Sequence, residues 1–306
     1  MYPLDEKLIF TGVAPVILYQ EELAKHTTWR IGGPADVLAI PDHISQVMEL
    51  VRMAKNHGIP YFVLGRGSNL LVKDGGIRGL VIKMGELFSQ LTINGSDLVV
   101  QSGRSIVSTA HVAMKNGLSG LEFATGIPGT VGGAVMMNAG AHGSAIQDVI
   151  QSVQVLTPAG EVANLLVPAL NFHYRSSALR DSGNVVLSAT FALTPGNVEE
   201  MLGKVKAWSL RRHATQPLSF PSCGSVFRNP PGDHAARLIE AVGLKGTRIG
   251  DAMISDLHAN FIINLGHASA KDVMALMKSA QERVKAVFAI ELVPEVRLVG
   301  EDEARG

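Results

Sequence analysis

The alternation of apolar and polar residues near the start of the chain predicts a strand, a helix and a second strand. Residues 35–40 and 61–64 form short apolar runs of the kind found in buried strands. Between them, apolar residues recur at helical spacing, at Ile44, Val47, Met48, Val51 and Ala54. The pattern therefore predicts a strand–helix–strand unit whose second strand runs directly into Gly65.

Turn-forming residues indicate further strands and a helix before residue 195. Asn94-Gly95 separates two apolar runs, and the Thr-Pro-Ala-Gly sequence at 157–160 separates two more, so each pair is expected to form a hairpin. Residues 105–116 have the spacing of a helix, and residues 79–84 and 185–193 are expected to be strands. This part of the chain therefore mixes both kinds of element.

The Thr-Pro-Gly sequence at 194–196 interrupts the pattern, and we place a domain boundary there. Beyond it we expect an amphipathic helix, a shorter helix, a strand, a long helix and a last strand, at residues 198–208, 235–242, 260–264, 273–287 and 292–299. The fold class is therefore expected to be α+β. The chain is expected to divide into an N-terminal segment, a first domain and a second domain, at residues 1–25, 26–195 and 196–306.

Composition and charge exclude several classes of partner and site. Basic and acidic side chains number 27 each, so the neutral chain offers no basic stripe for nucleic acid. Cys223 is the only cysteine, which excludes an internal disulfide and a multi-cysteine zinc site and favours a reducing compartment. The chain lacks the basic start of a signal peptide, and no apolar stretch reaches the roughly 18 residues of a membrane span. We expect a cytoplasmic monomer without membrane insertion.

Two glycine-rich segments are the first candidates for chemistry. The first consists of Leu64, Gly65, Arg66, Gly67, Ser68 and Asn69. Glycines let the backbone adopt positive φ and approach a ligand closely, and successive N–H groups can then bind an anion. Leu70 stands where the G-x-G-x-x-G dinucleotide motif requires glycine, so the loop is not that motif. An ordinary tight turn after a strand accounts for this loop equally well.

The second glycine-rich segment spans residues 122–143. Four of its glycines fall within eight residues, at Gly126, Gly129, Gly132 and Gly133. Such a backbone can lie against a flat ring or a diphosphate while the following residues begin a helix, although close helix packing would also use these glycines. Because two such loops occur in one domain without metal ligands between them, a nucleotide-like cofactor is favoured and no metal site is expected.

Seven motifs, in the same order along the chain, resemble those of the UDP-N-acetylenolpyruvoylglucosamine reductase family. They are Thr27–Ala35, Leu64–Asn69, Thr125–Gly133, Tyr174–Ser177, Ser222–Pro230, His258–Asn260 and Val293–Arg297. The resemblance covers nearly the whole chain, from about residue 20 to residue 300. It implies an FAD-binding domain of the vanillyl-alcohol-oxidase (PCMH) type in two α+β subdomains, followed by a smaller α+β substrate-binding domain.

The resemblance also implies a reaction. Members of the family use NADPH and non-covalent FAD to reduce UDP-N-acetylglucosamine enolpyruvate to UDP-N-acetylmuramate, a step of peptidoglycan precursor synthesis. Hydride passes from NADPH to FAD and then to the vinyl carbon, and a proton follows at the carbon that bears the carboxylate. The expected partners are therefore a UDP-sugar and NADPH.

Three residues match the family's reacting positions. Arg175 is expected to pair with the substrate carboxylate, Ser225 to donate the proton, and Glu295, kept protonated by burial, to hydrogen-bond the substrate or relay a proton. Spacing alone would favour Cys223 as the acid, because a thiol is more acidic than a hydroxyl. The resemblance assigns that role to Ser225, and Cys223 is interpreted as a packing residue.

The remaining site residues follow from the same resemblance. The expected cofactor contacts are Leu64, Gly65, Arg66, Gly67, Ser68, Asn69, Thr125, Gly126, Ile127, Gly129, Thr130, Gly132, Gly133, Arg212 and Arg297. The expected substrate contacts are Tyr174, Asn229 and His258. The short interval after Tyr174 has no tyrosine-bearing insertion, so the chain resembles the branch of the family without that loop. Other histidines show no ligand spacing and are interpreted as structural or exposed, at His142, His173, His213, His234 and His267.

Two alternatives remain open. A sugar or lactone oxidoreductase with the same flavin fold would keep both glycine loops, and so would a flavin-binding electron-transfer subunit. The motifs of Ser225 and Glu295 argue against the oxidoreductase, and the electron-transfer subunit would not need Arg175, Ser225 and Glu295 together.

Overall fold

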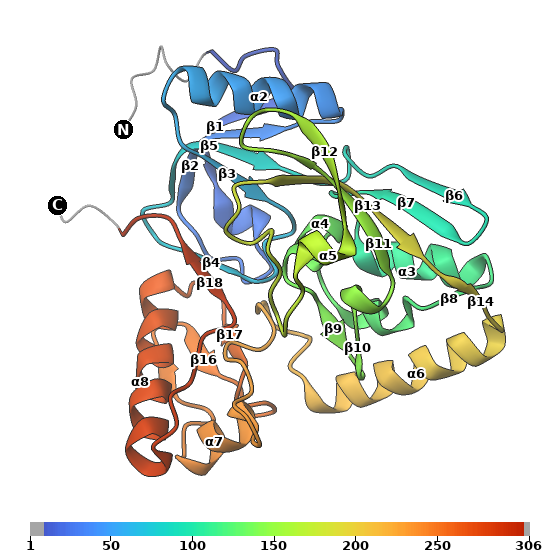
Figure 1. The fold of residues 1–306 in the computed structure, drawn as a ribbon. Coiled ribbons are helices and arrows are strands. Elements are labelled where there is room, and N and C mark those ends of the chain that lie inside the picture. Colours follow the sequence, from blue (N-terminus) through green and yellow to red (C-terminus); the bar gives the residue numbers. More distant parts are fainter. Residues whose placement is uncertain (1–8, 303–306) are drawn as a thin grey trace.

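The computed structural model describes residues 9–302, which form two α+β subdomains and a smaller C-terminal lobe (Figure 1). The first subdomain is built on a four-stranded sheet. Its strands, in spatial order, are β1 (Val16–Glu22), β2 (Pro34–Ile40), β5 (Ile77–Lys83) and β3 (Tyr61–Leu64). Strands β2 and β3 both run parallel to β5, and helix α2 (Ile44–Asn56) packs its apolar stripe on this sheet. The predicted strand–helix–strand unit is therefore present, with β5 inserted between its two strands.

The second subdomain contains a five-stranded antiparallel sheet. Its strands, in spatial order, are β12 (Val162–Leu166), β11 (Ile150–Leu156), β13 (Val185–Ala192), β7 (Asp97–Gln101) and β6 (Leu91–Asn94). Both predicted hairpins are confirmed, because β6 pairs with β7 and β11 pairs with β12. The helices that share the core of this sheet are α3 (Ile106–Lys115), the 3-10 helix η2 (Glu122–Gly126) and α4 (Val131–Met136).

Short elements complete the first two subdomains. They are η1 (Leu23–His26), β4 (Leu70–Val72), β8 (Leu118–Ser119), β9 (Gly140–Ala141), β10 (Ser144–Ala145), η3 (Ile146–Asp148), α5 (Val167–Leu170) and β14 (Thr194–Pro195). Helix α6 (Val198–Thr215) then runs along the second subdomain and packs Trp208 against its core. The predicted boundary after residue 195 stays a prediction, since α6 follows it and yet lies on the second subdomain.

The C-terminal lobe packs its helices against a small antiparallel sheet. Its elements are α7 (Ala235–Ala241), β15 (Arg248–Ile249), β16 (Ala252–Ile254), β17 (Ile262–Asn264) and α8 (Ala270–Phe288). A capping box at Ser269 and Asp272 begins α8. The lobe is joined to the first subdomain by Trp29, which is fully buried and donates its indole N–H to the Ile262 carbonyl at 2.9 Å.

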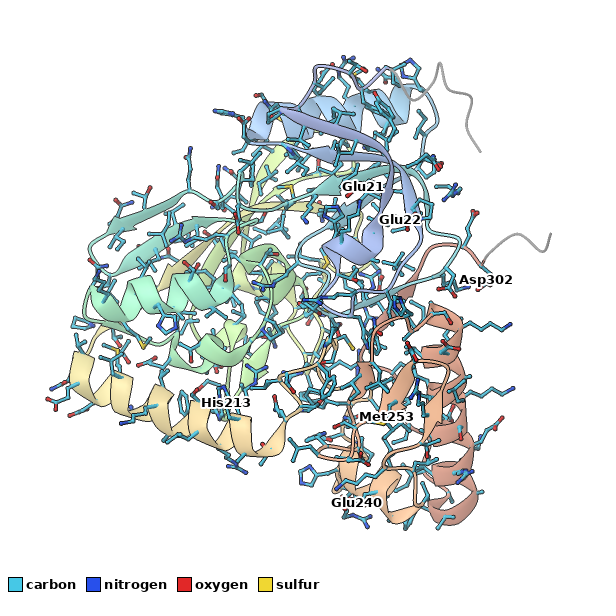
Figure 2. All side chains as sticks on the ribbon, turned by 180° about the vertical axis from the view of Figure 1, so that it is seen from behind. Glu21, Glu22, His213, Glu240, Met253 and Asp302 are labelled. Atoms are coloured by element: carbon cyan, nitrogen blue, oxygen red, sulfur yellow. The ribbon has the colours of Figure 1, made fainter. Side chains whose placement is uncertain are left out.

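The last strand returns to the first subdomain. Strand β18 (Arg297–Val299) pairs in parallel with β4. Asp302, labelled in Figure 2, lies beyond this strand, and its carboxylate forms an ion pair with Lys73 at 3.0 Å. The predicted strand over 292–299 is therefore too long. Pro294 has no N–H to donate, and the N–H of Glu295 donates to the Val226 carbonyl in the C-terminal lobe instead.

Two further properties concern the described residues 9–302. None of their helices is both long and apolar enough to cross a membrane. No group of three or more His, Cys, Asp or Glu side chains within this range is arranged to hold a metal ion.

Candidate active site

A cavity of about 480 Å³ lies where the two subdomains and the C-terminal lobe meet. Both glycine loops line it, together with the end of α6, the Ser225 loop and the segment before β18. Its wall carries one acid, Glu295, and a set of arginines, namely Arg66, Arg175, Arg211, Arg212 and Arg297. The chain is neutral overall, so positive charge is concentrated in this cavity, where it favours anionic ligands.

The first glycine loop connects β3 to β4 and needs glycine for space. Gly67 has φ of +65°, and a Cβ there would lie 2.7 Å from the His26 carbonyl oxygen. A Cβ on Gly65 would lie 2.6 Å from the Thr130 hydroxyl oxygen, which belongs to the second glycine loop. The two loops, one from each subdomain, are therefore in contact at the cavity wall.

The second glycine loop leads into α4, as the sequence predicts. Thr130 caps this helix, because its hydroxyl oxygen accepts the N–H of Gly133 at 3.3 Å. Arg212 of α6 contacts the loop, because its guanidinium donates a hydrogen bond to the Gly126 carbonyl. Its Nε donates a second hydrogen bond to the side-chain oxygen of Gln216 at 2.7 Å. Arg212 thus contacts the loop that the resemblance assigns to the cofactor.

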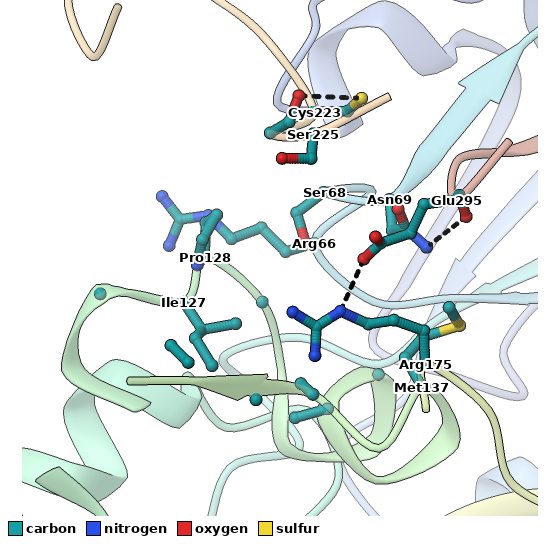
Figure 3. A pocket seen from close by; sticks show the side chains of 18 of the residues that line it. Arg66, Ser68, Asn69, Ile127, Pro128, Met137, Arg175, Cys223, Ser225 and Glu295 are labelled. Atoms are coloured by element: carbon teal, nitrogen blue, oxygen red, sulfur yellow. Dashed lines mark hydrogen bonds and ion pairs between the residues drawn. The ribbon is translucent and has the colours of Figure 1, made fainter. Parts of the chain in front are cut away.

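The carboxyl of Glu295 and the guanidinium of Arg175 form an ion pair inside the cavity, with 3.0 Å between Oε1 and Nε (Figure 3). Arg175 has φ of +57° and sits in a tight turn whose two ends, His173 and Ser176, exchange backbone hydrogen bonds. Burial raises the pKa of Glu295 above its ordinary value, while the positive charges of Arg175 and Arg228 act in the opposite direction.

Ser225 lies on a loop of the C-terminal lobe and lines the same cavity as Glu295 and the second glycine loop (Figure 3). Asn260 holds this loop by hydrogen bonds to both backbone polar groups of Phe227, at 2.9 and 2.8 Å. Cys223 also lines the cavity and is buried. Burial raises the pKa of its thiol, and the nearby charge of Glu295 raises it further. The advantage of sulfur as an acid is therefore reduced at this position.

Several of the expected site residues do not line the main cavity. Leu64 is buried in the core, and the Thr125 hydroxyl donates to the Glu122 carbonyl at 2.8 Å. A Cβ on Gly132 would lie 2.8 Å from that of Ser102, so this glycine permits close helix packing. His258 packs its ring edge-on against Phe261, with the ring centres 4.8 Å apart.

Tyr174 and Asn229 do line the cavity. The Tyr174 side chain is 57% exposed and carries the Arg175 guanidinium over its ring at 5.0 Å. The side-chain oxygen of Asn229 accepts the N–H of Ala235 at 3.1 Å, which fixes it beside the start of α7. All the remaining expected contacts line the cavity, namely Gly65, Arg66, Gly67, Ser68, Asn69, Gly126, Ile127, Gly129, Thr130, Gly133, Arg212 and Arg297.

Sequence reasoning missed an aromatic pair on the cavity wall. The His142 ring stacks on Trp208 with the ring centres 4.2 Å apart and the planes at 3°. His142 was interpreted only as structural or exposed. Two features of the sequence could have indicated this pair. His142 lies at the end of the second glycine-rich segment, and Trp208 lies on the apolar face of its helix.

The residues present fit an extended dinucleotide such as FAD. A second cavity of about 80 Å³ lies between the two subdomains and shares Gly65, Thr130 and Gly133 with the first. The hydroxyl of Ser102 is buried on its wall without a hydrogen-bond partner among the described residues. A ligand that passes between the glycine loops would supply that partner.

Comparison with known proteins assigns this architecture to a family. Residues 35–166 match the family described as FAD binding domain, and residues 216–299 match that described as UDP-N-acetylenolpyruvoylglucosamine reductase, C-terminal domain. The chain is 44% identical over 286 residues to the UDP-N-acetylenolpyruvoylglucosamine reductase of Clostridium kluyveri, a match that covers 94% of each protein. The chain belongs to the UDP-N-acetylenolpyruvoylglucosamine reductase family.

Other reductases of this name agree with the assignment. The protein from Halalkalibacterium halodurans is 45% identical over 281 residues, covering 92% of this chain and 93% of its own. A solved UDP-N-acetylenolpyruvylglucosamine reductase from Thermus caldophilus superposes with a TM-score of 0.80 at 37% identity, covering 92% of this chain and 98% of that one. The resemblance and the two-part α+β fold expected from the sequence are therefore confirmed, and the protein is an FAD-dependent oxidoreductase.

Proposed function

We propose that this member of the family reduces UDP-N-acetylglucosamine enolpyruvate to UDP-N-acetylmuramate with electrons from NADPH, by way of FAD. The observation that carries the proposal is the meeting of Arg175, Ser225 and Glu295, from three separate segments, in the cavity lined by both glycine loops. An electron-transfer subunit without a substrate would have no use for a buried acid paired with an arginine there.

The proposed cofactor contacts are the backbones of the two glycine loops, with Arg212 and Arg297 beside them. Arginines on the same wall suit a diphosphate. When bound, FAD supplies the site that accepts hydride from NADPH and passes it to the substrate. The proposed compartment is the cytoplasm, the proposed partners are NADPH and a UDP-sugar, and the proposed state is a monomer.

Arg175 binds the substrate carboxylate in this mechanism. Addition of hydride to the terminal vinyl carbon leaves negative charge on the neighbouring carbon, and this charge spreads onto the carboxylate. A guanidinium that pairs with the carboxylate oxygens therefore binds more strongly as the charge develops. Because Arg175 pairs with Glu295 at 3.0 Å, the substrate carboxylate must compete with Glu295 for it.

Ser225 then delivers the proton from its hydroxyl to the carbon that bears the carboxylate. A serine hydroxyl suits this step only because the acceptor is a strongly basic carbanion. Glu295, whose pKa is raised by burial, is protonated more readily once Arg175 turns to the substrate. Its carboxyl can then donate a hydrogen bond to the substrate or return a proton to Ser225.

The test is turnover with the proposed substrates. Purified protein should carry FAD, and adding UDP-N-acetylglucosamine enolpyruvate should trigger NADPH oxidation with formation of UDP-N-acetylmuramate, detected by mass spectrometry. Flavin reduction by NADPH without any reoxidation by this substrate would contradict the proposal. Oxidation of free sugars or lactones instead would favour the alternative oxidoreductase.

A further inference from the structure

A short antiparallel contact connects the Ser225 loop to the segment that carries Glu295. Phe227 and Pro294 form its central bridge. The Arg228 N–H donates to the Val293 carbonyl at 2.9 Å, and the Glu295 N–H donates to the Val226 carbonyl at 2.8 Å. In this register Arg228 and Glu295 are diagonal neighbours on the same face, a relationship that brings long side chains within reach of each other.

The Arg228 guanidinium forms no ion pair with an acidic side chain among the described residues. Its Nε is buried and has no hydrogen-bond partner there. Arg228 does not line the cavity, whereas Glu295 does. The positive charge of Arg228 lowers the pKa of Glu295 through space and without a hydrogen bond between them. Glu295 therefore has two cationic neighbours, Arg175, its ion-pair partner in the cavity, and Arg228, which approaches from the bridged loop and does not line the cavity.

We propose that Arg228 is a positioning residue, the fixed cation that stays beside Glu295 when Arg175 turns to the substrate carboxylate. The proposal rests on the proposed function for the role of Arg175. Once the substrate carboxylate neutralises the charge of Arg175, burial would keep the Glu295 carboxyl protonated. Arg228 opposes that effect, so the carboxyl can both give and regain a proton during turnover.

No other group near Glu295 can keep a positive charge beside it while Arg175 binds the substrate. Cys223 is an uncharged thiol, because its pKa is raised by burial. Arg175 is the group that is withdrawn in the proposed mechanism. Arg297 lines the cavity two residues further along and is expected to contact the cofactor, whose phosphates would neutralise it. Arg228, outside the cavity, is the cation that no ligand in the cavity neutralises.

The experiment follows the titration of Glu295 directly in the FAD-bound protein. Side-chain carboxyls are labelled with carbon-13, and Glu295→Gln identifies the resonance of this residue. In Arg228→Met the midpoint should move upward by about 0.5–1 pH unit, and in Arg228→Lys it should stay near the wild-type value. Arg283→Met removes an exposed arginine of α8 as the matched control and should not move it. An unchanged midpoint in Arg228→Met would overturn the proposal.

A second measurement separates this proposal from the proposed function. The rate of flavin reoxidation by UDP-N-acetylglucosamine enolpyruvate is followed against pH, and its Glu295-dependent limb should shift upward in Arg228→Met. A shifted titration in a protein that never turns over this substrate would contradict the proposed function and leave the Arg228 effect standing. Should Arg228→Met fail to retain FAD, Arg228→Gln removes the charge and keeps polar atoms, and the same upward shift is expected.

Discussion

The side-chain amide of Asn69 donates a hydrogen bond to the backbone carbonyl of Glu295 at 3.2 Å, across 226 residues of sequence. Arg297 repeats the link, because its N–H donates to the Asn69 carbonyl at 3.0 Å. The first glycine loop and the segment with the proposed acid are therefore one hydrogen-bonded unit. These hydrogen bonds fix the position of Glu295 relative to a ligand bound by the loop. They do so although the two sides of the cavity come from distant parts of the sequence.

Replacing Ser225 by alanine should separate the two half-reactions. NADPH should reduce the flavin at nearly the wild-type rate, because no proton from Ser225 is needed there. Reoxidation by the enolpyruvyl substrate should slow by about 10²–10⁴-fold, the usual contribution of a positioned proton donor. Stopped-flow absorbance of the flavin measures both steps. Ser222→Ala, three positions earlier and outside the cavity lining, should slow neither, and equal slowing in both variants would exclude Ser225 as the donor.

Replacing Arg175 by methionine should weaken the use of substrate without removing the flavin. The variant loses the charge-assisted pair to the substrate carboxylate, so kcat/KM for the UDP-sugar should fall by about 10²-fold or more. Arg175→Lys, which keeps the charge and loses the planar fork, should recover part of this loss. Steady-state NADPH oxidation measures both variants. A wild-type kcat/KM in Arg175→Met would contradict its assignment.

Two glycines with the same backbone angle allow a matched test of the first glycine loop. Gly67 and Gly58 both have φ of +65°, but only Gly67 lies against backbone, with a Cβ position 2.7 Å from the His26 carbonyl oxygen. Alanine at either position costs about 1–2 kcal/mol for the left-handed conformation. Gly67→Ala should in addition displace the loop and lose FAD on gel filtration, while Gly58→Ala should retain it. Equal retention would mean that the loop does not hold the cofactor.

The raised pKa of Glu295 predicts a pH dependence of stability. The folded protein keeps this proton at pH values where the unfolded chain, with an ordinary pKa of 4.5, has released it. Stability should therefore fall as pH rises from about 4.5 through the pKa of the folded state, and this contribution should be constant above it. Urea midpoints from about pH 4 to about pH 8 measure the effect, and Glu295→Gln should flatten that decline. Exposed Glu291→Gln should leave the decline unchanged.

The strong periodic segments of the fold were predictable from sequence. The stripe of α2 and the turn at Asn94-Gly95 are local patterns, and both elements form where expected. The segment before β18 was mispredicted, because the partner of Glu295 is Val226, which no local pattern reveals. In the sequence, Trp208 is likewise an ordinary residue of an amphipathic helix. Its stacking with His142 could not be predicted, because only the fold brings the two rings together.

For the candidate site, the motifs predicted which residues belong to it but not which side chains contact one another. Arg175 and Glu295 were each predicted, yet nothing in either motif indicates that the two side chains pair with each other. His258 belongs to a matching motif, yet it packs edge-on against Phe261 and does not itself line the cavity. Such contacts depend on how separate segments meet, which residue types alone do not determine.

The pairing of β18 with β4 has a consequence for how the protein is made. Strand β4 has β18 as its strand partner, and these two strands lie far apart in the sequence. A ribosome synthesises the chain from its N-terminus, so Leu70 emerges long before Arg297 exists to pair with it. The nascent chain therefore carries an open strand edge and an incomplete cavity wall throughout most of translation. The part of the cavity wall that carries Glu295 and Arg297 is therefore absent until β18 has been synthesised.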